Sequence, residues 1–315
     1  MAKYTFEDIV AESALMKSLM DKAVLYASTN AGILINGNSG TGKELLAQSI
    51  HNASPRHNQP FVAVNCAAIP ASLLESELFG YEEGAFSGAK KGGKRGLFEL
   101  AHKGTIFLDE INSMPIELQS VLLRTIQEKE IRRVGAQKNI YVDIRIISAC
   151  NKNMEELIAD GKFRADLYYR LNTLKLTMPD LETRKEDIPP LCRYFLKRYS
   201  AKYSVPIPAL SPEDSEILLK RSWPGNVREL ENTMHRYVIL SSLQHCSVND
   251  CLDGTPPKQA ASSGASQPPL EGTLAQMELA LIRKCLEENH GSREKTAKQL
   301  GISRSTLWKK LSQQA

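Results

Sequence analysis

The sequence predicts an α/β fold, in which a parallel sheet carries helices on both faces, followed by regions that are all helical. Four short apolar segments without polar alternation are typical of buried strands. They are residues 31–36, 61–66, 105–110 and 144–150. Amphipathic segments such as 44–53 and 115–128 lie between them. Alternating strands and helices indicate crossover connections within one parallel sheet.

The strand signals end near residue 180, and the following segments have the start signals of helices. Ser211 is expected as an N-cap with Asp214 at the third helical position. Asn226 is expected as the N-cap of a further helix, with Glu229 three residues on in a capping-box arrangement. A small helical domain is therefore expected after the sheet.

Composition gives the remaining boundaries. Residues 253–272 consist largely of Pro, Gly, Ser and Ala, which predicts a flexible linker. Beyond it, residues 274–289 have the pattern of one amphipathic helix. The expected domains are a sheet domain at 1–178, a helical domain at 179–252, the linker at 253–272 and a C-terminal helical domain at 273–315.

Several classes of protein are excluded by the same sequence. No apolar run approaches the roughly 18 residues of a membrane-spanning helix, and the N-terminus has no signal-peptide core. The six cysteines form no CxxC pair and no zinc-like cluster with histidine. A reducing, cytoplasmic location without membrane attachment fits best. The net charge is +4, yet residues 291–315 hold six basic residues and one acid.

Residues 37–44, GNSGTGKE, lie between an expected strand and an expected helix and match the phosphate-binding loop G-x-x-x-x-G-K. The glycines let backbone N–H groups converge on phosphate oxygens, and the helix N-terminus adds its positive dipole end. Lys43 is expected to reach the β- and γ-phosphates. A purely structural glycine turn is the alternative, and the strand–loop–helix context disfavours it. The expected ATP-binding residues are Gly37, Asn38, Ser39, Gly40, Thr41, Gly42, Lys43 and Glu44.

Glu44 stands where the general motif has a magnesium-binding Ser or Thr, so another acid is needed for the metal. Thr41 could offer a hydroxyl. The strand TIFLDE ends in Asp109 and Glu110, of which Asp109 is expected to hold Mg²⁺ and Glu110 to polarise the attacking water. A solvated acidic turn is the alternative. Two carboxylates behind an apolar strand favour ATP hydrolysis over simple nucleotide binding.

Six segments, in this order, resemble the bacterial enhancer-binding proteins, which are AAA+ ATPases that activate sigma-54 RNA polymerase. They are GNSGTGKELLAQSIH, FVAVNCAAIP, ESELFGYEEGAFSGA, GTIFLDEI, FRADLYYRLN and WPGNVREL. The resemblance extends from about Phe6 to Leu311, apart from the linker. It implies an AAA+ α/β ATPase domain, a helical lid at 179–252 and a Fis-type helix-turn-helix at 273–315.

The resemblance implies roles near the carboxylates. Asn65 corresponds to the residue that hydrogen-bonds Glu110 and turns it from the water until nucleotide and partner are in place. Asn151 is similar to the sensor of the γ-phosphate, and Cys150 beside it stands where the family commonly has threonine. A strand-end asparagine that satisfies a turn is the alternative for Asn65.

The resemblance also implies roles for three arginines. Arg164 and Arg170 correspond to arginine fingers that complete the ATP site of a neighbouring subunit. Arg228 corresponds to a second sensor that reaches from the lid to the phosphates. Surface ion pairs are the alternative for Arg164 and Arg170. The implied assembly is a homo-oligomer, from dimer to hexameric ring.

Residues 84–89, GAFSGA, match the family loop GAFTGA, which implies contact with sigma-54. The expected contact residues are Gly84, Ala85, Phe86, Ser87, Gly88 and Ala89. Ser87 replaces the family threonine and loses a methyl group worth about 1 kcal/mol if it is buried at the contact. Activation is therefore expected to be weakened but retained.

Residues 292–311 fit a helix-turn-helix, with Gly301 at the turn and Ser303 as the cap of the second helix. The expected DNA-binding residues are Arg304, Ser305, Thr306, Lys309 and Lys310. One such unit reads a half-site, so paired use on upstream enhancer DNA is expected. A small basic helical bundle of another use is the alternative.

The leading interpretation is a sigma-54-dependent transcription activator, in which ATP hydrolysis remodels the closed complex of sigma-54 RNA polymerase holoenzyme into an open one. One alternative is a related regulator that represses or activates without contacting sigma-54. Another is an ATPase acting on nucleic acid, such as a clamp loader or helicase, which does not predict the GAFSGA segment. The chain begins almost directly at the ATPase domain, so control by a separate protein or by a missing N-terminal sensor domain is expected.

Overall fold

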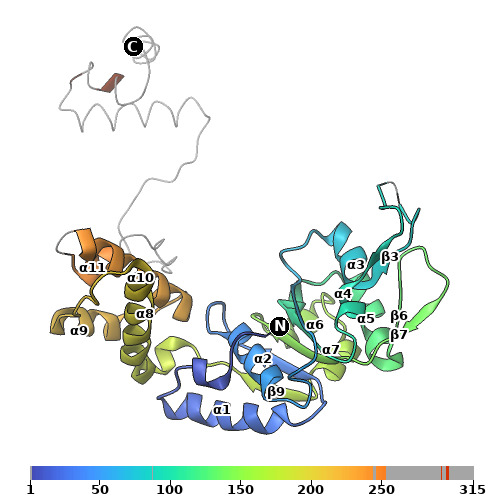
Figure 1. Ribbon diagram of the computed structural model, residues 1–315, viewed down its shortest axis with the longest axis horizontal. Helices are drawn as coiled ribbons and strands as arrows, with labels where there is room; N and C mark the ends of the chain where they lie inside the picture. Colours follow the sequence, from blue (N-terminus) through green and yellow to red (C-terminus); the bar gives the residue numbers. More distant parts are fainter. Residues whose placement is uncertain (1, 87, 244–245, 253–291, 293–295, 298–315) are drawn as a thin grey trace. The chain divides into compact units, whose positions relative to one another are not determined.

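The computed structural model describes residues 2–86, 88–243, 246–252, 292 and 296–297 (Figure 1). The chain divides into two compact units, Met1–Thr255 and Pro256–Ala315. The first unit contains all the helices and strands given below. Within the described part of the chain, no helix is both long and apolar enough to cross a membrane.

The centre of the first unit is a five-stranded sheet whose strands all pair in parallel, in the order β2-β5-β8-β1-β9. The strands are β1 (Ile33–Asn36), β2 (Phe61–Asn65), β5 (Thr105–Asp109), β8 (Arg145–Cys150) and β9 (Leu174–Thr177). The predicted fold class is therefore confirmed, and the four expected strands are present. The edge strand β9 was not expected, because only one of its residues is fully buried and it lacks a continuous apolar run.

Helices cover both faces of the sheet. Ile33, Phe107 and Ile147 share a buried cluster with residues of α1 and α2. Leu34 and Leu108 point to the opposite face and share a cluster with residues of α3, α5 and α7. These helices are α1 (Ala14–Ala27), α2 (Lys43–Asn52), α3 (Ala71–Phe79), α4 (Leu97–Leu100), α5 (Ile116–Glu128), α6 (Met154–Ala159) and α7 (Ala165–Leu171), with short turns η1 (Phe6–Asp8) and η2 (Ile111–Ser113).

Two short hairpins extend from this domain and lie side by side (Figure 1), since Tyr81 bridges Val134. One pairs β3 (Gly80–Tyr81) with β4 (Lys94–Arg95), and the other pairs β6 (Glu130–Arg132) with β7 (Asn139–Tyr141). The first hairpin carries the GAFSGA segment between its strands.

The lid is a separate helical group with its own core around Trp223, Leu230 and Met234 (Figure 1). Its elements are η3 (Leu181–Thr183), η4 (Lys185–Asp187), α8 (Ile188–Tyr203), α9 (Pro212–Lys220), α10 (Asn226–Leu243) and α11 (Val248–Leu252). The predicted cap of α9 is confirmed, because Ser211 Oγ accepts from the Asp214 N–H at 3.0 Å and the Asp214 carboxylate accepts from the Ser211 N–H at 3.2 Å.

The predicted cap of α10 is wrong in detail. Asn226 is the first helical residue, and the Glu229 N–H donates to the Gly225 carbonyl rather than to the Asn226 side chain. The Glu229 carboxylate in turn accepts from the Gly225 N–H at 2.8 Å. The Asn226 side-chain oxygen instead accepts from the Leu181 N–H within the lid at 2.8 Å.

Candidate functional site

A cavity of about 390 Å³ lies between the phosphate-binding loop and the lid. Its walls include Lys43, Asp109, Glu110 and Arg228, together with residues of the N-terminal segment. The parallel register places Asn36 beside Cys150 and Asn65 beside Asp109, so the carboxyl ends of these strands meet at one edge. Ligands of open α/β sheets bind outside this edge.

The loop between β1 and α2 is shaped for phosphate. Gly42 caps α2 in a left-handed conformation, φ +104°, and the helix begins at Lys43. Gly40 also has positive φ, and a Cβ added there would stand 2.3 Å from the Gly225 carbonyl oxygen of the lid. Only glycine therefore fits at position 40. Backbone N–H groups at this helix start are free to converge on an anion.

Lys43 is folded back onto this loop. Its Nζ donates to the carbonyl oxygens of Gly37 at 2.8 Å and Asn38 at 3.0 Å. Burial lowers the pKa of Lys43, while the negative charges of Asp109 and Glu110 act in the opposite direction. The cation is thus held over the loop, where the β- and γ-phosphates of a nucleotide would lie.

The two carboxylates follow β5 but are held differently. Asp109 accepts from the Glu110 N–H at 3.0 Å and from Asn65 Nδ2 at 3.2 Å. Glu110 has a left-handed backbone, φ +51°, which turns its side chain away from the strand direction. Such a conformation in a residue other than glycine is uncommon and concentrates at functional sites.

The expected partner of Asn65 is therefore corrected: its side chain contacts Asp109, not Glu110. The reason is the strand register, in which Asn65 and Asp109 are direct neighbours on β2 and β5. The Asn65 oxygen accepts from the N–H groups of Ala67 and Ala68 at 2.9 and 3.1 Å. These two hydrogen bonds form the strand-end turn that was considered as the alternative. Asn65 therefore both closes this turn and contacts a carboxylate of the site.

The Glu110 carboxylate instead lies beside Asn151, the residue expected to sense the γ-phosphate. Asn151 Nδ2 lies 3.4 Å from Glu110 Oε1, at the long end of hydrogen-bond distance. The Asn151 oxygen is buried without a hydrogen-bond partner among the described residues. Asn151 therefore lies beside the carboxylate expected to be the general base, with one acceptor free for a further donor.

Cys150 stands where the family commonly has threonine, and its thiol donates a hydrogen bond. Its Sγ lies 2.7 Å from Asn36 Oδ1, and burial raises the pKa of the thiol to about 11. The group therefore stays protonated at neutral pH and donates a hydrogen bond, as a threonine hydroxyl would.

The lid reaches the phosphate loop through the start of α10. Arg228 Nη1 donates to Ser39 Oγ at 3.1 Å, and its backbone N–H donates to the Gly40 carbonyl at 3.3 Å. Asn226 Nδ2 donates to the Ser39 carbonyl at 3.2 Å. The structure thus brings Arg228 to the loop, as the resemblance implies for a lid residue that senses phosphate.

Two further residues of this site were missed by the sequence analysis. Arg184 is 2% exposed, lines the cavity and donates from Nη2 to the Thr41 carbonyl at 3.1 Å. Its Nη1 lies 3.7 Å from Asp187, which accepts from both N–H groups of Glu12 and Ser13 at 2.7 Å. Arg184 and Asp187 therefore join the phosphate loop, the N-terminal segment and the lid. Both residues lie in the charged segment TRKED, residues 183–187. Its sequence is typical of a solvated surface, so it did not predict buried residues at the site.

The contact loop between β3 and β4 is open. Phe86 is 42% exposed, and its ring meets Tyr81 edge-on at 5.0 Å between centroids. Gly84 and Gly88 both have positive φ, and a Cβ added to either would have no atom within 4 Å. The loop rests on the second hairpin, because the Glu82 N–H donates to the Val134 carbonyl at 3.0 Å. Ser87 lies outside the described residues.

Comparison with protein families agrees with this geometry. The model of the sigma-54 interaction domain matches residues 9–177, which is more than half of the chain. The chain belongs to the family of sigma-54-dependent regulators. The model of the AAA+ ATPase lid domain matches residues 182–266, and that of the Fis family of bacterial regulatory proteins matches residues 273–313.

Known regulators match nearly the whole chain but are longer. A signal-transduction and transcriptional-control protein of Clostridium beijerinckii is 46% identical over 98% of this chain and 49% of its own length. UacR of Escherichia coli K12, named as a putative uric acid sigma-54-dependent transcriptional regulator, is 44% identical over 97% of this chain and 53% of its own length. The chain thus spans about half of these two relatives.

A solved structure of a relative supports the fold. NtrX from Brucella abortus in complex with ATP is 35% identical, with a TM-score of 0.74, over 97% of this chain and 69% of that chain. The sigma-54-dependent regulator described here therefore has the fold of an ATP-binding relative.

Two other expected residues, both arginines, lie away from the nucleotide cavity. Arg164 is exposed and bonds Asp166 through Nε at 3.0 Å, together with Ser120 Oγ at 3.3 Å. Arg170 is exposed on α7, and neither arginine lines the nucleotide cavity. The expected DNA-binding residues Arg304, Ser305, Thr306, Lys309 and Lys310 lie outside the described residues, as does the linker.

Proposed function

We propose that this chain is the ATPase and DNA-binding part of a transcription activator that hydrolyses ATP to open the sigma-54 polymerase complex at a promoter. The observation that carries this proposal is the joint presence of a cavity lined by Lys43, Asp109 and Glu110 and an open loop with an exposed Phe86. A nucleotide-binding regulator without sigma-54 contact needs only the first of these features.

Lys43 and the N–H groups of the phosphate loop bind and orient the nucleotide. Glu110 accepts a proton from the attacking water, and Asn151 sets the orientation of the Glu110 carboxylate. Two loop glycines allow close packing, because a Cβ would stand 2.8 Å from Met178 Cβ if added at Gly37 and 2.3 Å from the Gly225 carbonyl oxygen if added at Gly40. The Asp109 carboxylate, at the cavity edge beside Lys43, fits a Mg²⁺ ion, which would neutralise charge on the phosphate oxygens.

The active form is a homo-oligomeric ring, with a hexamer as the expected size. This part of the proposal is supported by Arg164 and Arg170, which are exposed and lie outside their own nucleotide cavity. Arginines in such positions can complete the site of a neighbouring subunit and stabilise the charge on the transferred phosphoryl group. The C-terminal segment would hold this ring at upstream enhancer DNA.

Regulation without sigma-54 contact remains the second candidate function. It is favoured only by Ser87, which departs from the family threonine within the contact loop. Serine retains the hydroxyl group of threonine, so the activator function is preferred.

The test is ATP-dependent formation of an open promoter complex by the purified chain with sigma-54 holoenzyme on supercoiled DNA. We expect ATP hydrolysis whose rate per protomer rises with protein concentration, together with promoter opening that requires ATP. Hydrolysis without opening would favour the second candidate. A protein with no ATPase activity at any concentration would contradict both the enzymatic and the activator assignments.

A further inference from the structure

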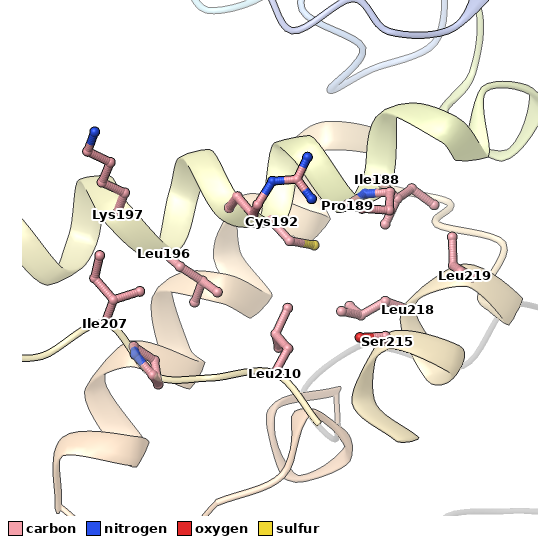
Figure 2. Close-up of a pocket in the computed structure, with 12 residues that line it drawn as sticks. Ile188, Pro189, Cys192, Leu196, Lys197, Ile207, Leu210, Ser215, Leu218 and Leu219 are labelled. Atoms are coloured by element: carbon pink, nitrogen blue, oxygen red, sulfur yellow. The ribbon is translucent and has the colours of Figure 1, made fainter. Parts of the chain in front are cut away.

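The lid contains a second cavity, which the nucleotide site does not use. It has a volume of about 510 Å³ and lies between α8, α9 and the segment 205–210 (Figure 2). The volume is within the range of small-molecule sites, about 300–1,000 Å³. Apolar side chains make up most of its wall, among them Cys192, Leu196, Leu210 and Leu218 (Figure 2).

One wall of the cavity is a segment without helix or strand. Ser204 ends α8 in a left-handed conformation, φ +54°, and the chain then continues without regular secondary structure through Pro206 and Pro208. Proline fixes φ and has no N–H, so this segment cannot continue the helix or pair as a strand with its neighbour. Ile207 stays 59% exposed at the edge of the cavity instead of filling it.

The charged residues that line the cavity are all basic. Arg193 and Lys197 lie one helical turn apart on α8, line the cavity and are exposed. Neither side chain has a hydrogen bond or ion pair within the described residues, and no acidic residue is part of the lining. In Figure 2 the Lys197 ammonium extends away from Leu210, and its flexible four-carbon stem allows it to turn back toward a bound anion.

The floor is uncharged. Burial raises the pKa of Cys192 to about 12, so its thiol is neutral at physiological pH. The Ser215 hydroxyl is already used, because it donates to the Ser211 carbonyl at 3.0 Å. A ligand therefore meets apolar groups in the depth of the cavity and two free cations at its edge.

We propose that this lid cavity binds an amphipathic carboxylate with a straight apolar tail of medium length. The α8 stripe that lines the cavity runs from Ile188 to Lys197, which is about 13 Å at roughly 1.5 Å per residue. An extended chain advances about 1.2 Å per bond, so a tail of about ten bonds matches this stripe. Arg193 and Lys197 would hold the carboxylate.

Ligand binding in the lid cavity would also change the affinity of the chain for nucleotide. Helix α8 forms a wall of both cavities, because Leu191, Tyr194 and Phe195 line the nucleotide cavity from its other side. A ligand that holds α8 in one position changes the affinity for nucleotide, and linkage requires the reciprocal effect. This coupling needs nucleotide binding only, so it does not depend on the proposed activation of polymerase.

The first experiment measures binding of decanoate to the full chain by titration calorimetry, below the concentration at which decanoate forms micelles. We expect one site per chain and an affinity about tenfold higher than for decanol, which lacks the charge. The double variant Arg193→Glu with Lys197→Glu should lose about tenfold in affinity for decanoate. Lys202→Glu, a single charge reversal on the same helix outside the cavity, is the control and should bind as the native chain does.

The variant Leu219→Trp places a larger side chain at the cavity edge, where Leu219 is 38% exposed. It should weaken decanoate binding, and its fluorescence reports any binding that persists. Equal affinities for decanoate and decanol, or unchanged binding in the double charge variant, would overturn the carboxylate site.

The second experiment measures the affinity for a fluorescent ATP analogue with and without saturating decanoate. A several-fold shift is expected in the native chain and none in the double charge variant. Decanoate binding with an unchanged nucleotide affinity would overturn the coupling through α8. Because neither measurement requires hydrolysis, failure here is distinct from failure of the proposed ATPase function.

Discussion

The nucleotide cavity and the contact loop differ in how firmly their key side chains are held. The Lys43 and Asp109 side chains each make two hydrogen bonds, and Arg228 is held by one hydrogen bond from its side chain and one from its backbone N–H. Phe86 has a ring contact with Tyr81 on one side and remains 42% exposed. Phosphate chemistry requires groups that are already in place, whereas partner recognition requires a surface still free to be buried. The two regions should therefore respond independently to substitution.

The largest effect is expected in the nucleotide cavity. Glu110→Gln removes the proposed general base but keeps its shape, so the rate of hydrolysis should fall by about 10²–10⁴-fold. Nucleotide affinity, measured with a fluorescent analogue, should change little. Glu117→Gln, a matched change at an exposed position of α5, should leave the rate unaltered. Equal rates for the native chain and Glu110→Gln would remove Glu110 from the mechanism.

The buried arginine behind the cavity should give the next largest effect. Arg184→Met leaves the fully buried Asp187 without its cation, and breaking such a pair costs about 3–5 kcal/mol. The free energy of unfolding in urea should fall by this order, and nucleotide affinity should fall with it. The exposed Arg132 is the control, since Arg132→Met should leave both quantities near their native values. A native-like Arg184→Met would mean that the lid and the phosphate loop are joined by other contacts.

The support of the contact loop should depend on pH. Arg133 donates to Glu99 in two hydrogen bonds of 2.7 Å, and these lower the pKa of Glu99. A carboxylate with a lowered folded-state pKa stabilises the fold above its unfolded pKa, about 4.3, and loses this contribution as pH falls through the folded value.

Glu99→Gln should therefore reduce the free energy of unfolding by about 1.5–3 kcal/mol at pH 7. The difference from the native chain should shrink steadily as the pH is lowered below about 4.3. A difference that stays constant across this pH range would show that packing, and not the ionised pair, stabilises the base of the hairpins.

A smaller effect is expected next to Phe86 itself. Tyr81→Leu removes an aromatic pair worth about 0.5–1.5 kcal/mol, while keeping an apolar side chain at this buried position. Promoter opening should fall by about two- to tenfold, with ATP hydrolysis unchanged. Tyr141→Leu, on the neighbouring hairpin, is the matched control. If both substitutions reduced hydrolysis equally, the loop and the cavity would not be independent.

The same comparison explains what the sequence could predict. Short apolar runs and the glycine pattern predicted four sheet strands and the phosphate loop, because both signals are local. Arg184 could not be found in this way, since its hydrogen bond to Thr41 joins residues 143 positions apart. The partner of Asn65 was mispredicted for a related reason: the register that places it beside Asp109 is a property of the assembled sheet. Strand β9 was missed because an edge strand needs little apolar sequence.

The independence of the two regions is tested most directly by Phe86→Ala, assayed for ATP hydrolysis and for opening of a supercoiled promoter by sigma-54 holoenzyme. The side chain is 42% exposed, so the substitution should leave the fold and the rate of hydrolysis close to native. Promoter opening should be abolished, because the loop loses the side chain that the partner would bury. Survival of both activities would contradict the contact role of Phe86, and loss of both would contradict the separation of the loop from the nucleotide cavity.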